Sequence, residues 1–197
     1  AQNTLGAGND TLSGIEYLTG SDFGDQLKGD GLTNLFLAGD SSDNIRGMDG
    51  DDFLFGEDGA DVVAGEDFSF NAAAFGNDII DGGAGNDRLR SFAGVDLVFG
   101  GADYDILEFR REDGVDLTFV IAAPGGAATF VGNGTEVTDV EEFEIDLEGG
   151  NHTLTLGDGD DRIVTHEGND VIDAGGGNDF IFNVRGRDTI DADAGDD

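Results

Sequence analysis

The sequence predicts an all-β protein: a right-handed parallel β-helix of the β-roll kind, in two stacks joined by an irregular β segment. Three observations predict this fold. A nine-residue phrase, represented by Gly-Gly-Ala-Gly-Asn-Asp-Arg-Leu-Arg at 82–90, recurs in phase along most of the 197 residues. A large apolar residue recurs at a fixed place within that phrase. The chain also has 35 glycines and no cysteine, so tight turns are abundant and no disulfide can brace the fold.

The charge balance restricts the possible partners. The chain has 44 acidic and 9 basic residues and a formal net charge of −35, so a closed fold repels itself unless cations bind. Nucleic acid and anionic membrane surfaces are therefore poor partners. No apolar run approaches the roughly 20 residues of a membrane span. Disorder is disfavoured, because hydrophobic residues make up 38% of the chain and recur at fixed spacing.

The first array of repeats covers 5–108. We number each repeat so that aspartate falls at position 6 and the large apolar residue at position 8. Residues 20–108 divide into repeats without a break, apart from an insertion at 68–75, and an isolated copy lies at 5–13. Position 6 holds Asp10, Asp25, Asn34, Asp43, Asp52, Asp61, Asp78, Asp87, Asp96 and Asp105. Position 8 holds Leu12, Leu27, Phe36, Ile45, Leu54, Val63, Ile80, Leu89, Val98 and Leu107.

A second array covers 156–197 and stops in mid-repeat. Its position 6 holds Asp161, Asp170, Asp179, Asp188 and Asp197, and its position 8 holds Ile163, Ile172, Ile181 and Ile190. The bridge at 109–155 has alternating apolar residues from Val115 to Ile121 and a turn signal at Pro124, which predicts a hairpin or two long β-coils. We expect a single β-roll module over 1–197 that is a fragment of a longer protein.

The spacing of the repeat suits calcium. Positions 7–9 form a short strand that points residue 8 to one side, and the glycine-rich positions 1–6 reverse the chain. Two repeats make one coil, so loops two repeats apart stack at roughly 4.7–4.9 Å. Calcium takes six to eight oxygen ligands at about 2.3–2.6 Å, which two stacked carboxylates and loop carbonyls can supply. The expected carbonyl donors lie in the loop backbone at Gly50, Gly59, Gly76, Gly83, Gly85, Gly94, Gly159, Gly168, Gly177 and Gly186.

The register also predicts which carboxylates share an ion. The eight expected pairs are Asp43–Asp61, Asp61–Asp87, Asp87–Asp105, Asp52–Asp78, Asp78–Asp96, Asp161–Asp179, Asp170–Asp188 and Asp179–Asp197. Sites formed with Asp25 or Asn34 are expected to be weaker, because repeats 20–28 and 29–37 lack the position-4 glycine. About eight calcium ions would reduce the net charge from −35 to −19. We therefore expect the calcium-free chain to be largely unfolded.

Two other interpretations of the polar residues carry less weight. A single Asp-Gly is usually an ordinary turn, but more than a dozen in-phase copies favour metal binding over turns or a solvated acidic surface. An EF-hand is excluded, because no loop with its ligand pattern occurs. Catalysis by this segment is not expected: His152 and His166 are isolated, and no hydrolase, metalloprotease or P-loop motif occurs.

The outward residues at positions 7 and 9 differ between the two expected sheets. One sheet has an apolar face formed by Leu35, Leu37, Phe53, Phe55, Ile79, Leu97 and Phe99. The insertion or the bridge could cover this face, or a neighbouring domain or second copy could bind it. The other sheet carries Lys28, Arg46, Arg88 and Arg90, which could bind an acidic polysaccharide or merely pair with the acidic loops.

The arrays resemble the RTX (hemolysin-type calcium-binding) repeat family over roughly three quarters of the chain. The resemblance implies a secreted bacterial protein, exported by type I secretion, whose position-6 aspartates bind calcium. It leaves open a structural and secretion-assisting module, a polysaccharide-binding accessory module of an exoenzyme such as a mannuronan epimerase, and an adhesin or surface-layer segment.

Overall fold

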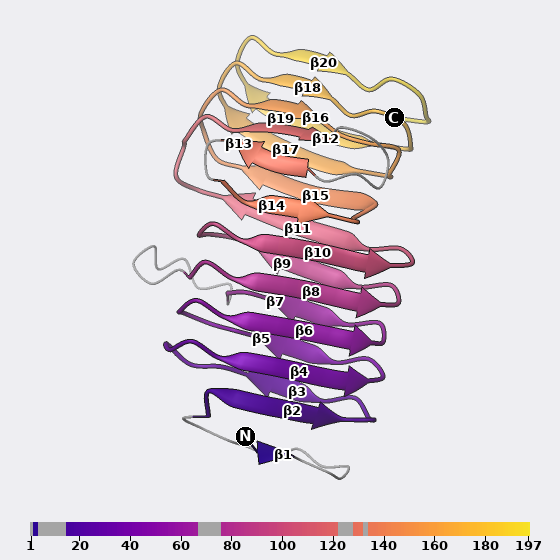
Figure 1. Cartoon of the computed structure of the whole chain (residues 1–197). Coiled ribbons are helices and arrows are strands. Elements are labelled where there is room, and N and C mark those ends of the chain that lie inside the picture. Colours follow the sequence, from indigo (N-terminus) through magenta and orange to yellow (C-terminus); the bar gives the residue numbers. More distant parts are fainter. Residues whose placement is uncertain (1, 4–14, 67–75, 122–127, 132–133) are drawn as a thin grey trace.

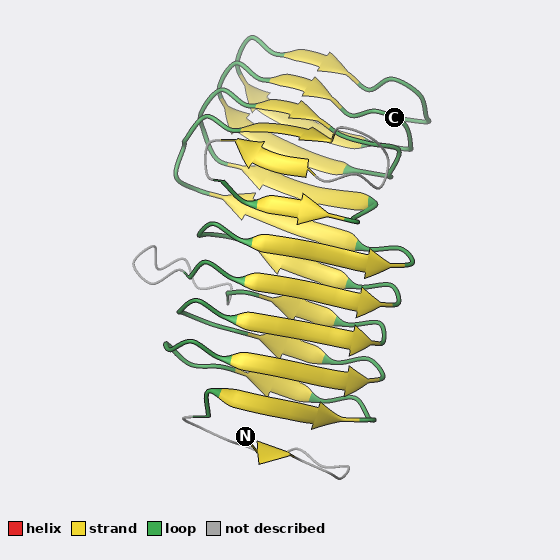
Figure 2. Cartoon of the chain, viewed as in Figure 1, coloured by secondary structure: helices red, strands yellow, loops and turns green. Residues whose placement is uncertain are grey.

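The structure is a computed structural model that describes residues 2–3, 15–66, 76–121, 128–131 and 134–197. All regular structure in these residues is β-strand, and the strands stack into a long parallel β-roll (Figures 1 and 2). None of the described residues belongs to a helix long and apolar enough to cross a membrane. The predicted fold class is therefore confirmed. The isolated repeat at 5–13, the insertion at 68–75 and the turn at Pro124 lie largely or wholly outside the described residues.

Two sheets face each other across the roll. Among the described residues, sheet A has twelve strands, in the spatial order β1 (Gln2–Asn3), β2 (Tyr17–Ser21), β4 (Leu35–Asp40), β6 (Phe53–Asp58), β8 (Ile79–Ala84), β10 (Leu97–Ala102), β14 (Glu136–Thr138), β13 (Ala128–Val131), β12 (Thr118–Ile121), β16 (Thr153–Thr155), β18 (Val171–Asp173) and β20 (Thr189–Asp191). Over the same residues, sheet B has eight, in the order β3 (Gln26–Lys28), β5 (Asn44–Arg46), β7 (Val62–Ala64), β9 (Arg88–Ser91), β11 (Ile106–Arg111), β15 (Glu142–Leu147), β17 (Arg162–Glu167) and β19 (Phe180–Arg185).

The strand register follows the repeat. Phe36 pairs with Leu54, eighteen residues later, as two nine-residue repeats require. Leu54 then pairs with Ile80, so the position-8 column continues in register across the segment that contains the insertion. The insertion therefore leaves the ladder intact.

The position-8 side chains form the core. From Leu27 to Leu107 each is at least 95% buried, and Ile163 and Ile172 continue the column in the second array. Ile190, in the last coil, is 46% exposed because no described coil follows it. In the middle of the stack the rings of Phe119 and Phe143 pack edge to face, with centroids 5.2 Å apart. The hydrophobic core is therefore continuous from the first array to the second.

The bridge joins the arrays as part of the stack. In sheet A, β12, β13 and β14 form an antiparallel meander between β10 and β16. The pairing of β12 with β13 is that of a hairpin, one of the two arrangements expected for this segment. In sheet B, β15 continues the parallel ladder directly from β11 to β17.

The second array is displaced by two residues along sheet B. Leu107 pairs with Phe143, but the next position-8 residue, Ile163, pairs with Ile145. The turn columns of the two arrays are therefore offset at the bridge, and each column must end and begin again there.

Candidate metal-binding columns at the turns

The position-6 aspartates stack in two columns along the edges of the roll. One column lies in the turns that lead from sheet A to sheet B, and the other in the turns that lead back. In each predicted pair, Oδ1 of the later aspartate accepts a hydrogen bond from the backbone N–H of the earlier one, at 2.8–3.0 Å; the Asp61 carboxylate, for instance, accepts from Asp43 at 2.8 Å. The structure thus brings together all eight predicted pairs.

The second carboxylate oxygen of most of these residues is buried and has no donor. Among the described residues this holds for Oδ2 of Asp43, Asp52, Asp61, Asp78, Asp87, Asp105, Asp161 and Asp179. A buried carboxylate oxygen without a donor or a cation costs free energy. Burial accordingly raises the pKa of Asp52 to about 7 and that of Asp78 and Asp161 to about 8, although each accepts a backbone hydrogen bond that lowers it. These oxygens need a proton or a cation.

Loop carbonyls line the same columns, and glycine at position 4 makes room for them. A Cβ built on Gly85 would lie 1.5 Å from the carbonyl oxygen of Gly59 in the preceding coil, and one on Gly177 would lie 2.1 Å from that of Gly159. Gly85 and Gly177 also have φ of 127° and 131°, which L-residues rarely adopt. Two of the repeats without glycine there have a strained backbone instead: Ser41 and Asp103, both at position 4, have φ of 76° and 83°.

Three of the predicted aspartates differ because a side chain or backbone donor already occupies Oδ2. Ser21 donates to Asp25 through both N–H (2.7 Å) and Oγ (2.9 Å), Ser91 Oγ donates to Asp96 at 2.5 Å, and Asn183 donates to Asp170 at 3.3 Å. In the last coil Asp188 is half-buried and Asp197 is exposed, and Asp10 lies outside the described residues. The carboxylates of the two columns are therefore not equivalent.

At the bridge, three residues that the repeat register did not predict take the place of aspartates in the columns. Glu141 Oε2 accepts the N–H of Asp105 at 2.9 Å, as a stacked aspartate would, and Thr135 Oγ1 accepts that of Asp96 at 3.2 Å. His152 occupies position 6 of a nine-residue repeat at 147–155. Its N–H donates to Asp170 Oδ1, and its Nε2 is buried without a hydrogen-bond partner among the described residues. The sequence signal for this repeat was Gly149-Gly150-Asn151 before His152 and Leu154 after it.

A second polar ladder runs along position 5, outside the aspartate columns. The side-chain oxygen of Asn169 accepts from Arg187 N–H at 3.1 Å, and Asn169 in turn donates to Asn151. Asn178 links Asp160 to Asp196 in the same way. These hydrogen bonds satisfy backbone N–H groups in the exposed turns of successive coils. They account for asparagine at position 5 without a metal.

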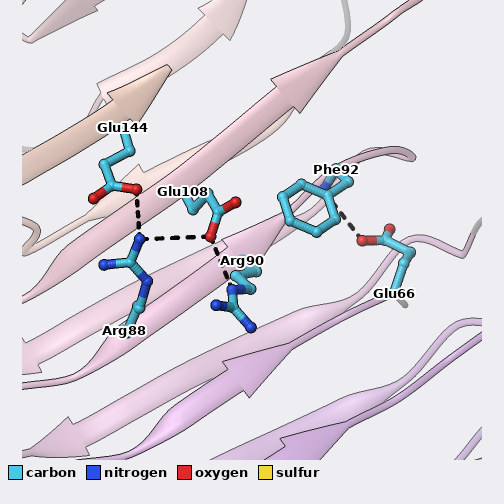
Figure 3. A network of polar contacts seen from close by, with 6 residues as sticks. All are labelled: Glu66, Arg88, Arg90, Phe92, Glu108 and Glu144. Carbon is cyan, nitrogen blue, oxygen red and sulfur yellow. Dashed lines mark hydrogen bonds and ion pairs between the residues drawn. The ribbon is translucent and has the colours of Figure 1, made fainter. Parts of the chain in front are cut away.

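The turn at Gly65 contains one further buried carboxylate. Glu66 is 3% exposed, and one carboxylate oxygen of each of Glu66, Asp78 and Asp96 lies within 4.8 Å of the others. Glu66 Oε2 accepts from Phe92 N–H at 3.1 Å (Figure 3). Glu66 Oε1 is buried and has no hydrogen-bond partner among the described residues. Burial, followed by the charges of Asp96 and Asp78, raises the pKa of Glu66 to about 9.

Arg88 and Arg90, two of the four basic residues expected on sheet B, are engaged in ion pairs. Arg88 pairs with Glu144 and, at 3.6 Å, with Glu108, and Arg90 pairs with Glu108 at 2.9 Å (Figure 3). These acidic partners come from neighbouring strands of the same outer face. Arg88 and Arg90 thus meet carboxylates of the chain itself, although these belong to strands β11 and β15 and not to the acidic loops that the sequence suggested.

The apolar face of sheet A is partly open over the described residues. Phe53, Leu97 and Phe99 are 40%, 36% and 38% exposed, while Leu35, Leu37, Phe55 and Ile79 are half-buried. The insertion proposed as its cover lies outside the described residues.

Stacked carboxylates, loop carbonyls and a parallel β-roll together define a calcium-binding repeat module. The model of the RTX calcium-binding nonapeptide repeat matches the chain in four copies, at residues 37–69, 73–107, 148–183 and 185–197. These copies cover more than half of the chain, and the chain belongs to this family. No curated protein matches the sequence. The third copy begins at 148 and so includes the coil of His152.

Proposed function

We propose that this chain is a calcium-stapled structural module of a secreted bacterial protein, which folds on calcium binding after type I secretion and assists that export. The observation that carries the proposal is the set of buried Oδ2 atoms without a donor. A hard dication satisfies such oxygens, and Oδ1 and the loop carbonyls lie in the same turns. The predicted pairs would hold the ions, about eight in all, and calcium would supply charge neutralisation and cross-links between coils.

The compartment follows from the affinity expected of such sites. Extracellular modules bind calcium at about 10⁻⁴–10⁻³ M, well above cytosolic levels. Without calcium, the buried carboxylates and the net charge of −35 oppose folding. The chain would therefore stay unfolded in the cytosol, in a state suited to export, and fold outside.

A calcium titration followed by far-UV circular dichroism tests the proposal. We expect a largely unfolded spectrum with chelator, a cooperative rise in β signal at submillimolar to millimolar calcium, and little response to the same concentration of magnesium, which demands a smaller octahedral site. The same β content with chelator and with millimolar calcium would overturn it.

Self-association is a second candidate function, favoured by the exposure of Phe53, Leu97 and Phe99. An adhesin or surface-layer segment could use this face to bind a second copy. Light scattering at saturating calcium should then detect oligomers that Phe53→Ser together with Phe99→Ser abolishes. A monomer at all concentrations would eliminate this candidate.

Acidic-polysaccharide binding has less support, because Arg88 and Arg90 are already paired with Glu108 and Glu144. Alginate-oligomer binding that disappears in Arg88→Ala plus Arg90→Ala would nevertheless establish it.

A further inference from the structure

Glu66 gives one turn a buried carboxylate at a position where the other described repeats have none. It lies at position 2, where the other described repeats carry glycine, a side chain without a carboxylate such as Ser21, or an exposed carboxylate such as Glu57. Here the side chain is buried beside Asp78 of its own turn and Asp96 of the next. Three carboxylates therefore meet where the repeat supplies two.

Among the described residues, two oxygens in this cluster have no donor. Glu66 Oε1 and Asp78 Oδ2 are both buried without a hydrogen-bond partner, in residues that are 3% and 1% exposed. The other oxygens are occupied: Glu66 Oε2 accepts from Phe92 N–H, Asp96 Oδ1 from Asp78 N–H and Asp96 Oδ2 from Ser91 Oγ. The nearby Arg111 donates to Gly94 O and pairs with Asp113. Glu66 and Asp78 therefore each keep one buried oxygen that a cation could bind.

The spacing fits one shared ion. Ligands at about 2.3–2.6 Å from calcium can be at most roughly 5 Å apart on opposite sides of it. The three carboxylates meet this condition, since their closest oxygens all lie within 4.8 Å of one another. More ligand charge generally gives tighter calcium binding.

We propose that Glu66, Asp78 and Asp96 form a three-carboxylate calcium site that holds its ion longer than any two-carboxylate site of the roll. Glu66 is a direct ligand there. The site joins the Gly65 turn to the following coil. This inference rests on the proposed function, because it assumes that the columns bind calcium.

Exchange of radioactive calcium out of the folded protein tests this site. The chain is loaded with ⁴⁵Ca and diluted into excess unlabelled calcium, so that it stays folded throughout, and the retained label is counted over time. We expect one ion per chain to leave the wild type at least about tenfold more slowly than the others. In Glu66→Gln this ion should leave as fast as the other ions do. Glu57→Gln changes an exposed glutamate at the same repeat position, and this variant should behave as the wild type does.

The outcomes separate this inference from the proposed function. If the wild type binds no ⁴⁵Ca at equilibrium before dilution, the calcium columns themselves are refuted. If it binds label but loses all of it at a single fast rate, the slow three-carboxylate site is refuted and the columns stand. If the wild type and Glu57→Gln both retain label and Glu66→Gln has the same exchange profile, Glu66 is not a ligand and carries a proton instead. Should Glu66→Gln fail to fold, a calcium-grown crystal of the wild type decides: an ion must lie about 2.3–2.6 Å from Glu66 Oε1, and its absence there overturns the inference.

Discussion

At the residue scale, each position-6 aspartate has two separate tasks. Its Oδ1 accepts a backbone N–H from the preceding coil, which any short acceptor can do, as Thr135 and Glu141 show. Its Oδ2 is buried and unpaired in eight of the described aspartates, and only a cation or a proton satisfies it. The aspartate is therefore required for its charge, and its hydrogen bond could be replaced.

Substitution of Asp61 separates these two tasks. Asp61→Asn keeps an oxygen acceptor for Asp43 N–H. It removes one negative charge from both the Asp43–Asp61 pair and the Asp61–Asp87 pair. We expect a loss of up to two bound ions by equilibrium dialysis and a several-fold higher calcium midpoint for folding. Asp58→Asn, at an exposed position 3 in the same repeat, is the matched control and should change neither. Equal ion counts in both variants would contradict the assignment.

Substitution of Gly85 tests the carbonyl column. Gly85→Ala adds a Cβ 1.5 Å from Gly59 O at φ of 127°, so the calcium-saturated protein should lose about 3 kcal/mol or more of stability in urea unfolding. The control is Gly31→Ala: the nearest atom to its new Cβ is 4.0 Å away, and a change below about 1 kcal/mol is expected. Comparable losses in the two variants would mean that the close approach of the coils does not matter.

At the scale of the strand, alternation decides what each side chain contributes. In β8, Ile80 is fully buried in the core, whereas its neighbour Ile79 is half-buried on the outer face. Ile80→Ala should therefore cost about 2–5 kcal/mol in urea unfolding at saturating calcium, and Ile79→Ala distinctly less. If Ile79→Ala cost as much as Ile80→Ala, the outer face of sheet A would be as well covered as the core.

The same scale shows what the sequence could predict. The period and phase of the repeat were enough to predict the strand register of the regular coils, because a slip of one residue would expose the position-8 column. They also predicted which aspartates pair across the insertion. The bridge was harder. Glu141 and His152 stand where the repeat has aspartate, and two extra residues shift the second array, so neither residue matched the pattern. Glu66 was missed because its burial depends on the neighbouring coil and leaves no local signal.

At the scale of the whole molecule, burial and charge oppose each other when calcium is absent. Burial raises the pKa of Asp52 and Asp105 to about 7 and that of Asp78 and Asp161 to about 8, against ordinary values near 3.8. Folded pKa values above unfolded ones mean that the folded chain binds more protons in this window. Stability without calcium must therefore fall as the pH rises from about 4 to about 8.

This pH dependence can be measured on the calcium-free chain by far-UV circular dichroism. In buffer stripped of metal, β signal should increase as the pH is lowered from about 8 to 5, above the isoelectric point of about 4.1. With saturating calcium the signal should stay constant between about pH 6 and 8, because the ion replaces the proton. A calcium-free β signal that instead grew with pH would contradict the burial of these carboxylates.

The central claim is that calcium lies between stacked turns in both columns, and a crystal structure grown in calcium with long-wavelength anomalous data tests it most directly. We predict anomalous peaks about 2.3–2.6 Å from the position-6 carboxylates of the predicted pairs, such as Asp43–Asp61 and Asp52–Asp78, in phase with the coils. Peaks confined to exposed acidic side chains, with none between these paired aspartates, would contradict the account.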